Sequence, residues 1–204
     1  MINAFLTGFF LGISLIVAIG AQNTFVLRQG IIGKYVWQVA LFCAVSDTLL
    51  IIIGVIGISF FLNNFNNQIS NFLFGFSSLW LFGYGILRLR SVFKSTETIK
   101  TEVLAPTSLL RTITIITVLT FANPHVYLDT MILIGSISQQ FIGLDKFNFA
   151  LGACFASFLF FFILAYTAKF YSSKMLHPYS WRILDLLVAV IMFSIALKLL
   201  YAGN

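Results

Sequence analysis

The chain consists largely of apolar runs that are long enough to cross a lipid bilayer. A bilayer core is about 30 Å thick, so a helix that crosses it needs about 20 mostly apolar residues. Six such runs fit the sequence, near residues 4–27, 37–62, 70–90, 112–136, 147–168 and 183–202. Only 9% of the 204 residues are charged, whereas a soluble domain averages about 25%. We therefore predict an all-α membrane protein with six transmembrane helices, in one integral membrane domain over residues 1–204.

The basic residues fall mainly on alternate connections between these runs. Ten of the twelve lie after the first, third and fifth runs, and only Lys146 and Lys198 lie on the other side. By the positive-inside rule, those three connections face the cytoplasm and both termini face outward. This topology, together with contact with anionic membrane lipid, accounts for the net charge of +6. We therefore expect no nucleic-acid partner.

A weak internal alignment relates residues 1–90 to residues 111–204, and a basic loop over 91–110 joins the two halves. Within it, Ala21–Leu27 aligns with Ala122–Leu128. Because each half holds three runs, the second half enters the membrane the other way up, which makes a 3+3 inverted repeat. Inverted repeats with broken helices at matching places are typical of secondary transporters.

Two carboxylates lie inside the predicted spans. Asp47 lies about 15 Å deep in the second span, and Asp129 lies about 9 Å from the outer end of the fourth, at about 1.5 Å per residue. A carboxylate near the bilayer centre costs roughly 2.5–3.5 kcal/mol, so intramembrane acids usually mark a site. We interpret both as transport residues. The alternative for each is a carboxylate that bonds to a neighbouring helix or stays protonated.

Two polar segments interrupt the apolar pattern at matching places in the two halves. One contains Gln22 and Asn23, and the other contains Asn123, Pro124 and His125. Proline removes a helical N–H and clashes with the preceding turn. The freed carbonyls could hold a cation, and the N-termini of the half-helices could hold a carboxylate. His125 could also relay protons, because histidine titrates near neutral pH. The alternative is a proline kink whose polar groups are satisfied by neighbouring side chains.

Several function classes are excluded by what the sequence lacks. It has no Walker-type phosphate loop, no cluster of metal-ligating residues and no arguable Ser/His/Asp grouping. We therefore expect neither an enzyme nor an ATP-driven pump, with no cofactor and no resident metal. Cys43 and Cys154 lie inside the apolar runs, and we interpret them as buried thiols.

Three segments resemble signatures of the lysine/arginine exporter family (LysE/ArgO type). The first is Ala18–Asn23 followed by Gln29–Ile31, the second is Cys43–Asp47, and the third is Asn123–Thr130. The third is the most specific, and it suggests the branch that carries basic amino acids. One departure is Ala21, which stands where the family usually has proline. The resemblance covers nearly the whole chain.

The resemblance implies a multi-pass exporter of L-lysine, L-arginine or both, driven by an ion gradient, in the bacterial cytoplasmic (inner) membrane. The residues agree, because a basic amino acid needs a carboxylate for its side chain and donors for its α-carboxylate. Asp47 and Asp129 offer the first, and the broken helices offer the second. Protons are a natural coupling ion if one aspartate is ionised to bind and neutral to return.

The alternative function is a metal-ion or thiol-redox carrier on a similar six-helix plan. The sequence leaves open the choice between lysine and arginine, the coupling ion and the oligomeric state, a homo-oligomer included.

Overall fold

The computed structural model describes residues 2–17, 20–64, 67–93, 108–172 and 178–202. These residues are almost entirely helical and contain no strand, which confirms the all-α prediction. Each of the six predicted runs contains helix. The elements are α1 (Ile2–Ile16), α2 (Ala21–Ile32), α3 (Val36–Asn64), α4 (Asn67–Val92), α6 (Leu109–Phe121), α7 (Pro124–Tyr127), the π-helix η1 (Leu128–Leu133), α8 (Ile134–Ser138), α9 (Leu144–Phe170) and α11 (Pro178–Ala202). Most of the basic loop predicted over 91–110 lies outside the described residues.

Two of the described helices are long and apolar enough to cross a membrane on their own. They are α3, over Val36–Gly57, and α9, over its whole length. Two bent pairs of helices pass the same test together, which brings the count to as many as four within the described residues. In one pair α1 and α2 meet at 81°, and in the other α6 and the Pro124–Ser138 segment meet at 60°. The six-span plan therefore stays a prediction.

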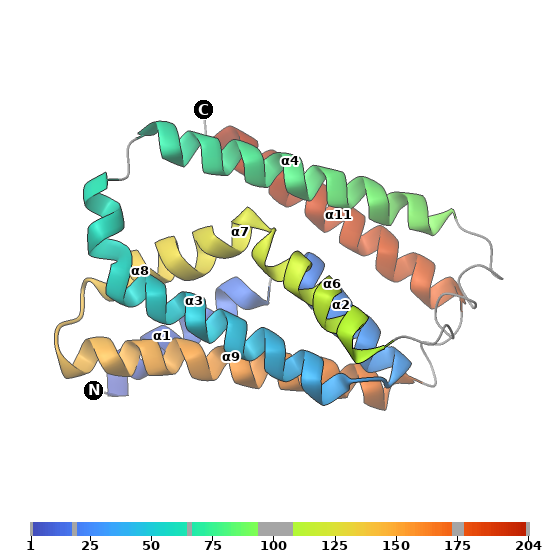
Figure 1. The fold of residues 1–204 in the computed structure, drawn as a ribbon, viewed down its shortest axis with the longest axis horizontal. Coiled ribbons are helices and arrows are strands. Elements are labelled where there is room, and N and C mark those ends of the chain that lie inside the picture. Colours follow the sequence, from blue (N-terminus) through green and yellow to red (C-terminus); the bar gives the residue numbers. More distant parts are fainter. Residues whose placement is uncertain (1, 18–19, 65–66, 94–107, 173–177, 203–204) are drawn as a thin grey trace.

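The helices form two groups with the bent segments between them (Figure 1). The long helices α4 and α11 run side by side along one edge, and α9 runs with α3 and α1 along the other. The segments α2, α6 and α7–α8 occupy the space between the two groups. A large buried apolar cluster joins α2, α3, α4, α6, α9 and α11, and a smaller one joins α1, α3, α8 and α9.

Small residues allow α1 and α9 to approach backbone to backbone. A Cβ placed on Gly8 would overlap the carbonyl oxygen of Phe149, and one placed on Gly152 would overlap that of Phe5. Glycines at such contacts let apolar helices pack closely where lipid removes the usual hydrophobic driving force. This contact holds the first half of the chain against the second.

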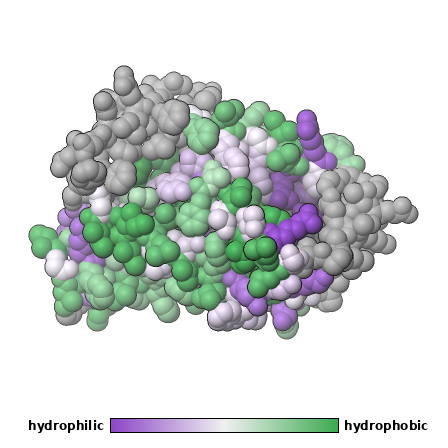
Figure 2. All heavy atoms as spheres, viewed as in Figure 1, coloured by the Kyte–Doolittle hydropathy of each residue, from purple (hydrophilic) through white to green (hydrophobic). Residues whose placement is uncertain are grey.

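Large apolar side chains cover much of the described surface. Figure 2 shows hydrophobic residues over the middle of one face, with hydrophilic residues gathered mainly toward one end. Ile56, Leu79 and Val190 are among the many exposed examples. Apolar patches this extensive are rare on soluble monomers, whereas a lipid-facing surface requires them.

Candidate functional site

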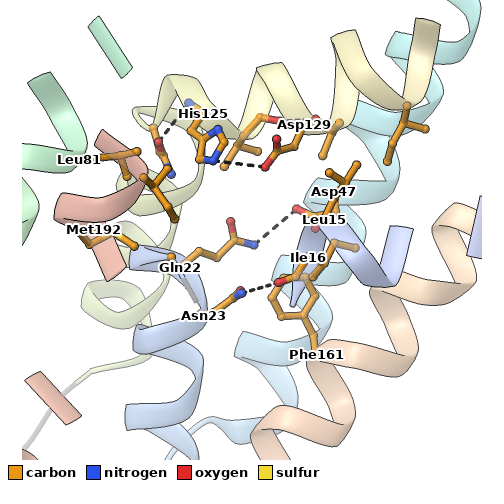
Figure 3. Close-up of a pocket in the computed structure, with 16 residues that line it drawn as sticks. Leu15, Ile16, Gln22, Asn23, Asp47, Leu81, His125, Asp129, Phe161 and Met192 are labelled. Atoms are coloured by element: carbon orange, nitrogen blue, oxygen red, sulfur yellow. Dashed lines mark hydrogen bonds and ion pairs between the residues drawn. The ribbon is translucent and has the colours of Figure 1, made fainter. Parts of the chain in front are cut away.

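A cavity of about 70 Å³ lies where the two bent segments meet. Both buried apolar clusters contribute to its wall, so it lies between them. By volume it has room for several water molecules, which the polar groups around it could bind. Its lining consists of Leu15, Ile16, Gly20, Gln22, Asn23, Asp47, Leu81, Asn123, His125, Val126, Asp129, Thr130, Ile134, Phe161, Met192 and Ile195 (Figure 3). Among these described residues there are two carboxylates and no lysine or arginine.

Asp47 projects from α3 and is only 4% exposed. Its two oxygens accept long hydrogen bonds from Gln22 Nε2 at 3.5 Å and from Ser157 Oγ at 3.4 Å. These donors come from α2 and α9, so Asp47 connects three elements; Figure 3 shows the contact with Gln22. Neutral donors at this distance compensate only partly for a buried charge. The carboxylate is therefore well placed to accept a stronger, cationic partner.

Asp129 lies on η1 and has a histidine beside it (Figure 3). His125 Nε2 lies 3.6 Å from Asp129 Oδ2, four residues earlier in the chain, so the two form an ion pair whenever the imidazole is protonated. The side chain of Asp129 is 22% exposed and that of His125 is 20% exposed. Both line the same cavity as Asp47, and the negative charge of Asp47 acts on Asp129. A cation in the cavity would relieve this repulsion.

The break in the second half is built by a proline and the asparagine before it. Asn123 has an extended backbone, and its side chain accepts a hydrogen bond from the His125 N–H at 3.2 Å, which caps α7. Pro124 follows at the start of α7, where its missing N–H costs nothing. The π-helix η1 comes next and carries Asp129 near its beginning. A π-turn inside a helix widens one turn and often occurs at functional sites.

The break in the first half lies slightly earlier than the sequence predicted. Helix α1 ends at Ile16 and α2 begins at Ala21, so Gln22 and Asn23 occupy the first turn of α2 and not the break itself. Gly20 supplies the extended residue before α2, in the absence of a proline. The Asn23 side chain donates to the Ile16 carbonyl at 2.7 Å and so satisfies part of the broken backbone.

The structure brings six of the seven predicted site residues to one cavity, although they come from distant parts of the chain. Gln22, Asn23, Asp47, Asn123, His125 and Asp129 all line it. Pro124 is buried but does not line it, and its part is to shape the break. Of the threonines on α6, Thr114 and Thr117 bond back to the preceding turn, which is the local role open to any helical threonine.

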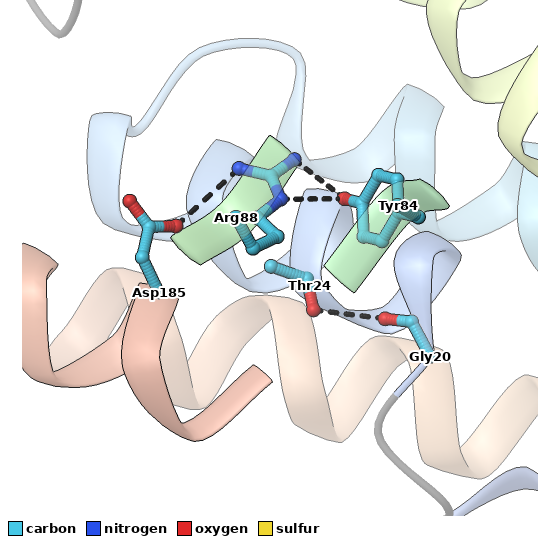
Figure 4. Close-up of polar contacts among 5 residues, drawn as sticks. All are labelled: Gly20, Thr24, Tyr84, Arg88 and Asp185. Carbon is cyan, nitrogen blue, oxygen red and sulfur yellow. Dashed lines mark hydrogen bonds and ion pairs between the residues drawn. The ribbon is translucent and has the colours of Figure 1, made fainter. Parts of the chain in front are cut away.

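Sequence reasoning misses a second buried polar cluster, which joins α4 to α11. Arg88 Nη1 lies 3.4 Å from Asp185 Oδ1, and its other nitrogens donate to the Tyr84 hydroxyl (Figure 4). The available signal was a third acid in a predicted span, because Asp185 lies three residues into the last run. Sequence reasoning also misses the Ser157 contact to Asp47 and the π-helix.

Comparison with known proteins identifies the family. Residues 13–203 match the model of the LysE type translocator family. The arginine exporter protein ArgO of Pectobacterium carotovorum subsp. carotovorum (strain PC1) is 37% identical over 205 residues, which cover 100% of this chain and 99% of the relative. ArgO of Salmonella enteritidis PT4 (strain P125109) is 35% identical over 203 residues, covering 100% of this chain and 96% of the relative.

A relative from Mycobacterium tuberculosis (strain ATCC 25618 / H37Rv) is 38% identical over 184 residues, which cover 90% of each chain. Its name gives amino-acid transport without specifying the amino acid. No solved structure matches the chain. The family match and the apolar helices identify a multi-pass membrane transporter, not an enzyme. The chain belongs to the LysE type translocator family.

Proposed function

We propose that this protein is a secondary transporter that exports arginine, with lysine as a second substrate, across the bacterial cytoplasmic (inner) membrane. One observation carries the proposal: two carboxylates from different elements, Asp47 and Asp129, line one cavity whose described lining contains no lysine or arginine. A cationic substrate neutralises charge there, whereas a neutral or acidic substrate does not. The relatives named as arginine exporters support the choice of arginine.

The arrangement of the helices supports an inverted repeat. In each half a bent segment precedes two long helices: α1–α2 before α3 and α4, and α6–α8 before α9 and α11. Helix α3 packs on α9 and α4 packs on α11, so equivalent helices pair with each other. Each bent segment also packs on the long helix of the other half, α1–α2 on α9 and η1–α8 on α3. A pseudo-two-fold axis through the cavity would produce this exchange.

The cavity also contains groups suited to proton coupling. Burial disfavours the charged form of a carboxylate, so Asp47 would bind a proton more readily when no cation is present. Substrate release would then be linked to protonation, and the neutral site could return across the membrane. His125 lies beside Asp129 and could carry protons between the cavity and its mouth.

Efflux from proteoliposomes tests the proposal. Vesicles containing the purified protein would be loaded with labelled arginine, lysine or leucine, and efflux would be followed at two pH gradients. We expect arginine and lysine to leave faster than from protein-free vesicles, at a rate that depends on the gradient, and leucine to stay. Efflux of leucine at the arginine rate would contradict charge matching, and an arginine rate that is the same at both gradients would contradict proton coupling.

A further inference from the structure

The cavity offers carboxylates for the cationic groups of a basic amino acid, but the substrate's own α-carboxylate needs a positive partner. The described lining contains no cationic side chain apart from His125, which faces Asp129. The nearest candidate along α4 is Arg88, whose side chain is 14% exposed. Leu81 of the same helix lines the cavity. Resting on the proposed function, we infer that Arg88 binds the α-carboxylate of the substrate and selects amino acids over simple amines.

The side chain of Arg88 extends back along α4 to Tyr84, in the direction of Leu81. Its Nε donates to the Tyr84 hydroxyl at 2.8 Å, and its Nη2 also contacts that oxygen, so the guanidinium lies over the turn before its own Cα (Figure 4). Tyr84 lies three residues from Leu81, which is about 4.5 Å along the helix. An extended arginine spans roughly 7 Å between its carboxylate carbon and its guanidinium carbon, across six bonds of about 1.5 Å. A substrate in the cavity beside Leu81 is therefore long enough to reach the level of Tyr84, whose hydroxyl the guanidinium of Arg88 contacts.

The guanidinium keeps donors for a ligand. An arginine has five N–H groups, and Arg88 uses three in its contacts with Tyr84 and Asp185. The remaining two lie one on each terminal nitrogen, which is the pair of donors that a carboxylate accepts in a bidentate arrangement. The contact to Asp185 is long, at 3.4 Å, so it holds the guanidinium in place without saturating it.

The charge of the surroundings favours an anion. Arg28, on α2, lies near enough that its charge acts on the Tyr84 hydroxyl. Of the charges that act on this hydroxyl, those of Arg88 and Arg28 each outweigh that of Asp185. A substrate α-carboxylate placed beside the hydroxyl would therefore meet a field that favours an anion. Tyr84 belongs to the same buried cluster as Ala21 of α2, whose first turn adds N–H groups and a positive helix end on this side of the cavity.

Agmatine provides the test, because it is arginine without the α-carboxylate. In proteoliposomes the KM for arginine efflux would be compared with the inhibition constant of agmatine. We expect the wild type to favour arginine, and Arg88→Gln to raise the KM for arginine roughly tenfold to a hundredfold with the agmatine constant little changed. Arg90→Gln removes an exposed guanidinium from the same helix and serves as the matched control, with no change expected.

Asp185→Asn separates recognition from a merely structural role. It breaks the same ion pair but leaves the guanidinium of Arg88 available, so we expect the preference for arginine over agmatine to persist or to increase. If the ion pair is merely structural, both variants should weaken the binding of arginine and of agmatine equally, and that result would overturn the inference. Arg88→Lys keeps the positive charge but loses the paired N–H donors of the guanidinium, so it should give an intermediate preference. It replaces Arg88→Gln if that variant does not insert into the membrane.

The wild-type measurement separates the two proposals. Absence of arginine efflux by the wild type would overturn the proposed function, and the role of Arg88 with it. Arginine efflux with an unchanged preference in Arg88→Gln would overturn the role of Arg88 alone.

Discussion

At the scale of single residues, Asp47 and Asp129 line one cavity but have different surroundings. Asp47 is almost fully buried and is held by neutral donors from two other elements. Asp129 is more exposed and has His125 beside it. A carboxylate without a cationic partner gains most from binding a cation, whereas one beside a titratable group can form an ion pair with that group instead. We therefore expect Asp47 to be indispensable and Asp129 to tune the preference for cations.

Asp47→Asn should abolish arginine efflux while the protein still inserts. The amide keeps the size of the side chain but can neither neutralise a cation nor exchange a proton, so we expect a loss of roughly a hundredfold or more. Efflux from proteoliposomes measures this, with the amount of inserted protein determined in parallel. Asp145→Asn, at the start of α9 and outside the cavity lining, is the matched control. Near wild-type efflux by Asp47→Asn would make this carboxylate structural.

Asp129→Asn should retain some transport but lose selectivity. One carboxylate remains in the cavity, so a cation still gains charge compensation there, although less of it. We expect the ratio of arginine efflux to leucine efflux to fall by about tenfold, in line with the loss of one partly exposed charge contact. Competition by unlabelled leucine against labelled arginine gives the ratio independently. A variant with reduced rate and unchanged selectivity would assign Asp129 to coupling and not to recognition.

At the scale of elements, the sequence predicts well which segments are helical, and it predicts less well where those helices break. The apolar runs indicate where the helices lie, because each run must bury its backbone hydrogen bonds within itself. Asn123 and Pro124 identify the second break, because proline has a local and unavoidable effect. The first break lies before Gln22, and no single residue marks it as strongly.

Other features depend on contacts between distant segments and leave no local pattern. Ser157 reaches Asp47 only because α9 packs on α3, and the Arg88–Asp185 pair exists only because α4 packs on α11. The π-helix at Asp129 packs against α3, and no residue pattern in the sequence marks it. The acids can therefore be predicted from sequence, whereas their partners require the fold.

Gly152→Ala should weaken the contact between α1 and α9. The added methyl group meets the backbone of Phe5, which has no rotamer to adopt, so the helices must separate. Overpacking of this kind typically costs about 1–3 kcal/mol. We expect a lower melting temperature in detergent and less inserted protein. Gly57→Ala adds the same group on α3 where nothing lies within 4 Å, so it should leave the melting temperature unchanged. Equal behaviour of the two variants would contradict close packing at Gly152.

At the scale of the whole molecule, the buried side chains differ on the two sides of the cavity. Toward one side lies the smaller apolar cluster, which includes Ile51, Ile134 and Phe149. Toward the other side lie the partly buried Arg88 and the buried Asp185 and Gln29. The ends of α2 and α4 and the start of α6, which flank two of the predicted basic connections, lie on this second side (Figure 1). These polar residues therefore lie on the side that we assign to the cytoplasm, from which an exporter collects its substrate.

Labelling of single cysteines tests this orientation with positions that the structure describes. Helix α3 begins at one end of the molecule and α9 begins at the other (Figure 1). Lys34 is exposed just before α3, and Ile142, which is 88% exposed, lies just before α9. In a background without Cys43 and Cys154, Lys34→Cys should react with a membrane-impermeant maleimide only from the cytoplasmic side. The positive-inside rule places the connection that contains Arg28 and Lys34 in the cytoplasm. Ile142→Cys, at the other end of the molecule, should therefore react only from outside.

A permeant maleimide, which should label both variants, controls for accessibility. Reaction of both positions from the same side would contradict an odd number of crossings between residues 34 and 142, and with it the inverted repeat. If each position reacts from the side opposite to the one expected, the inverted repeat is retained and the orientation of the protein in the membrane is reversed. Arg88 would then lie toward the outside, and its role would shift from collecting the substrate to releasing it.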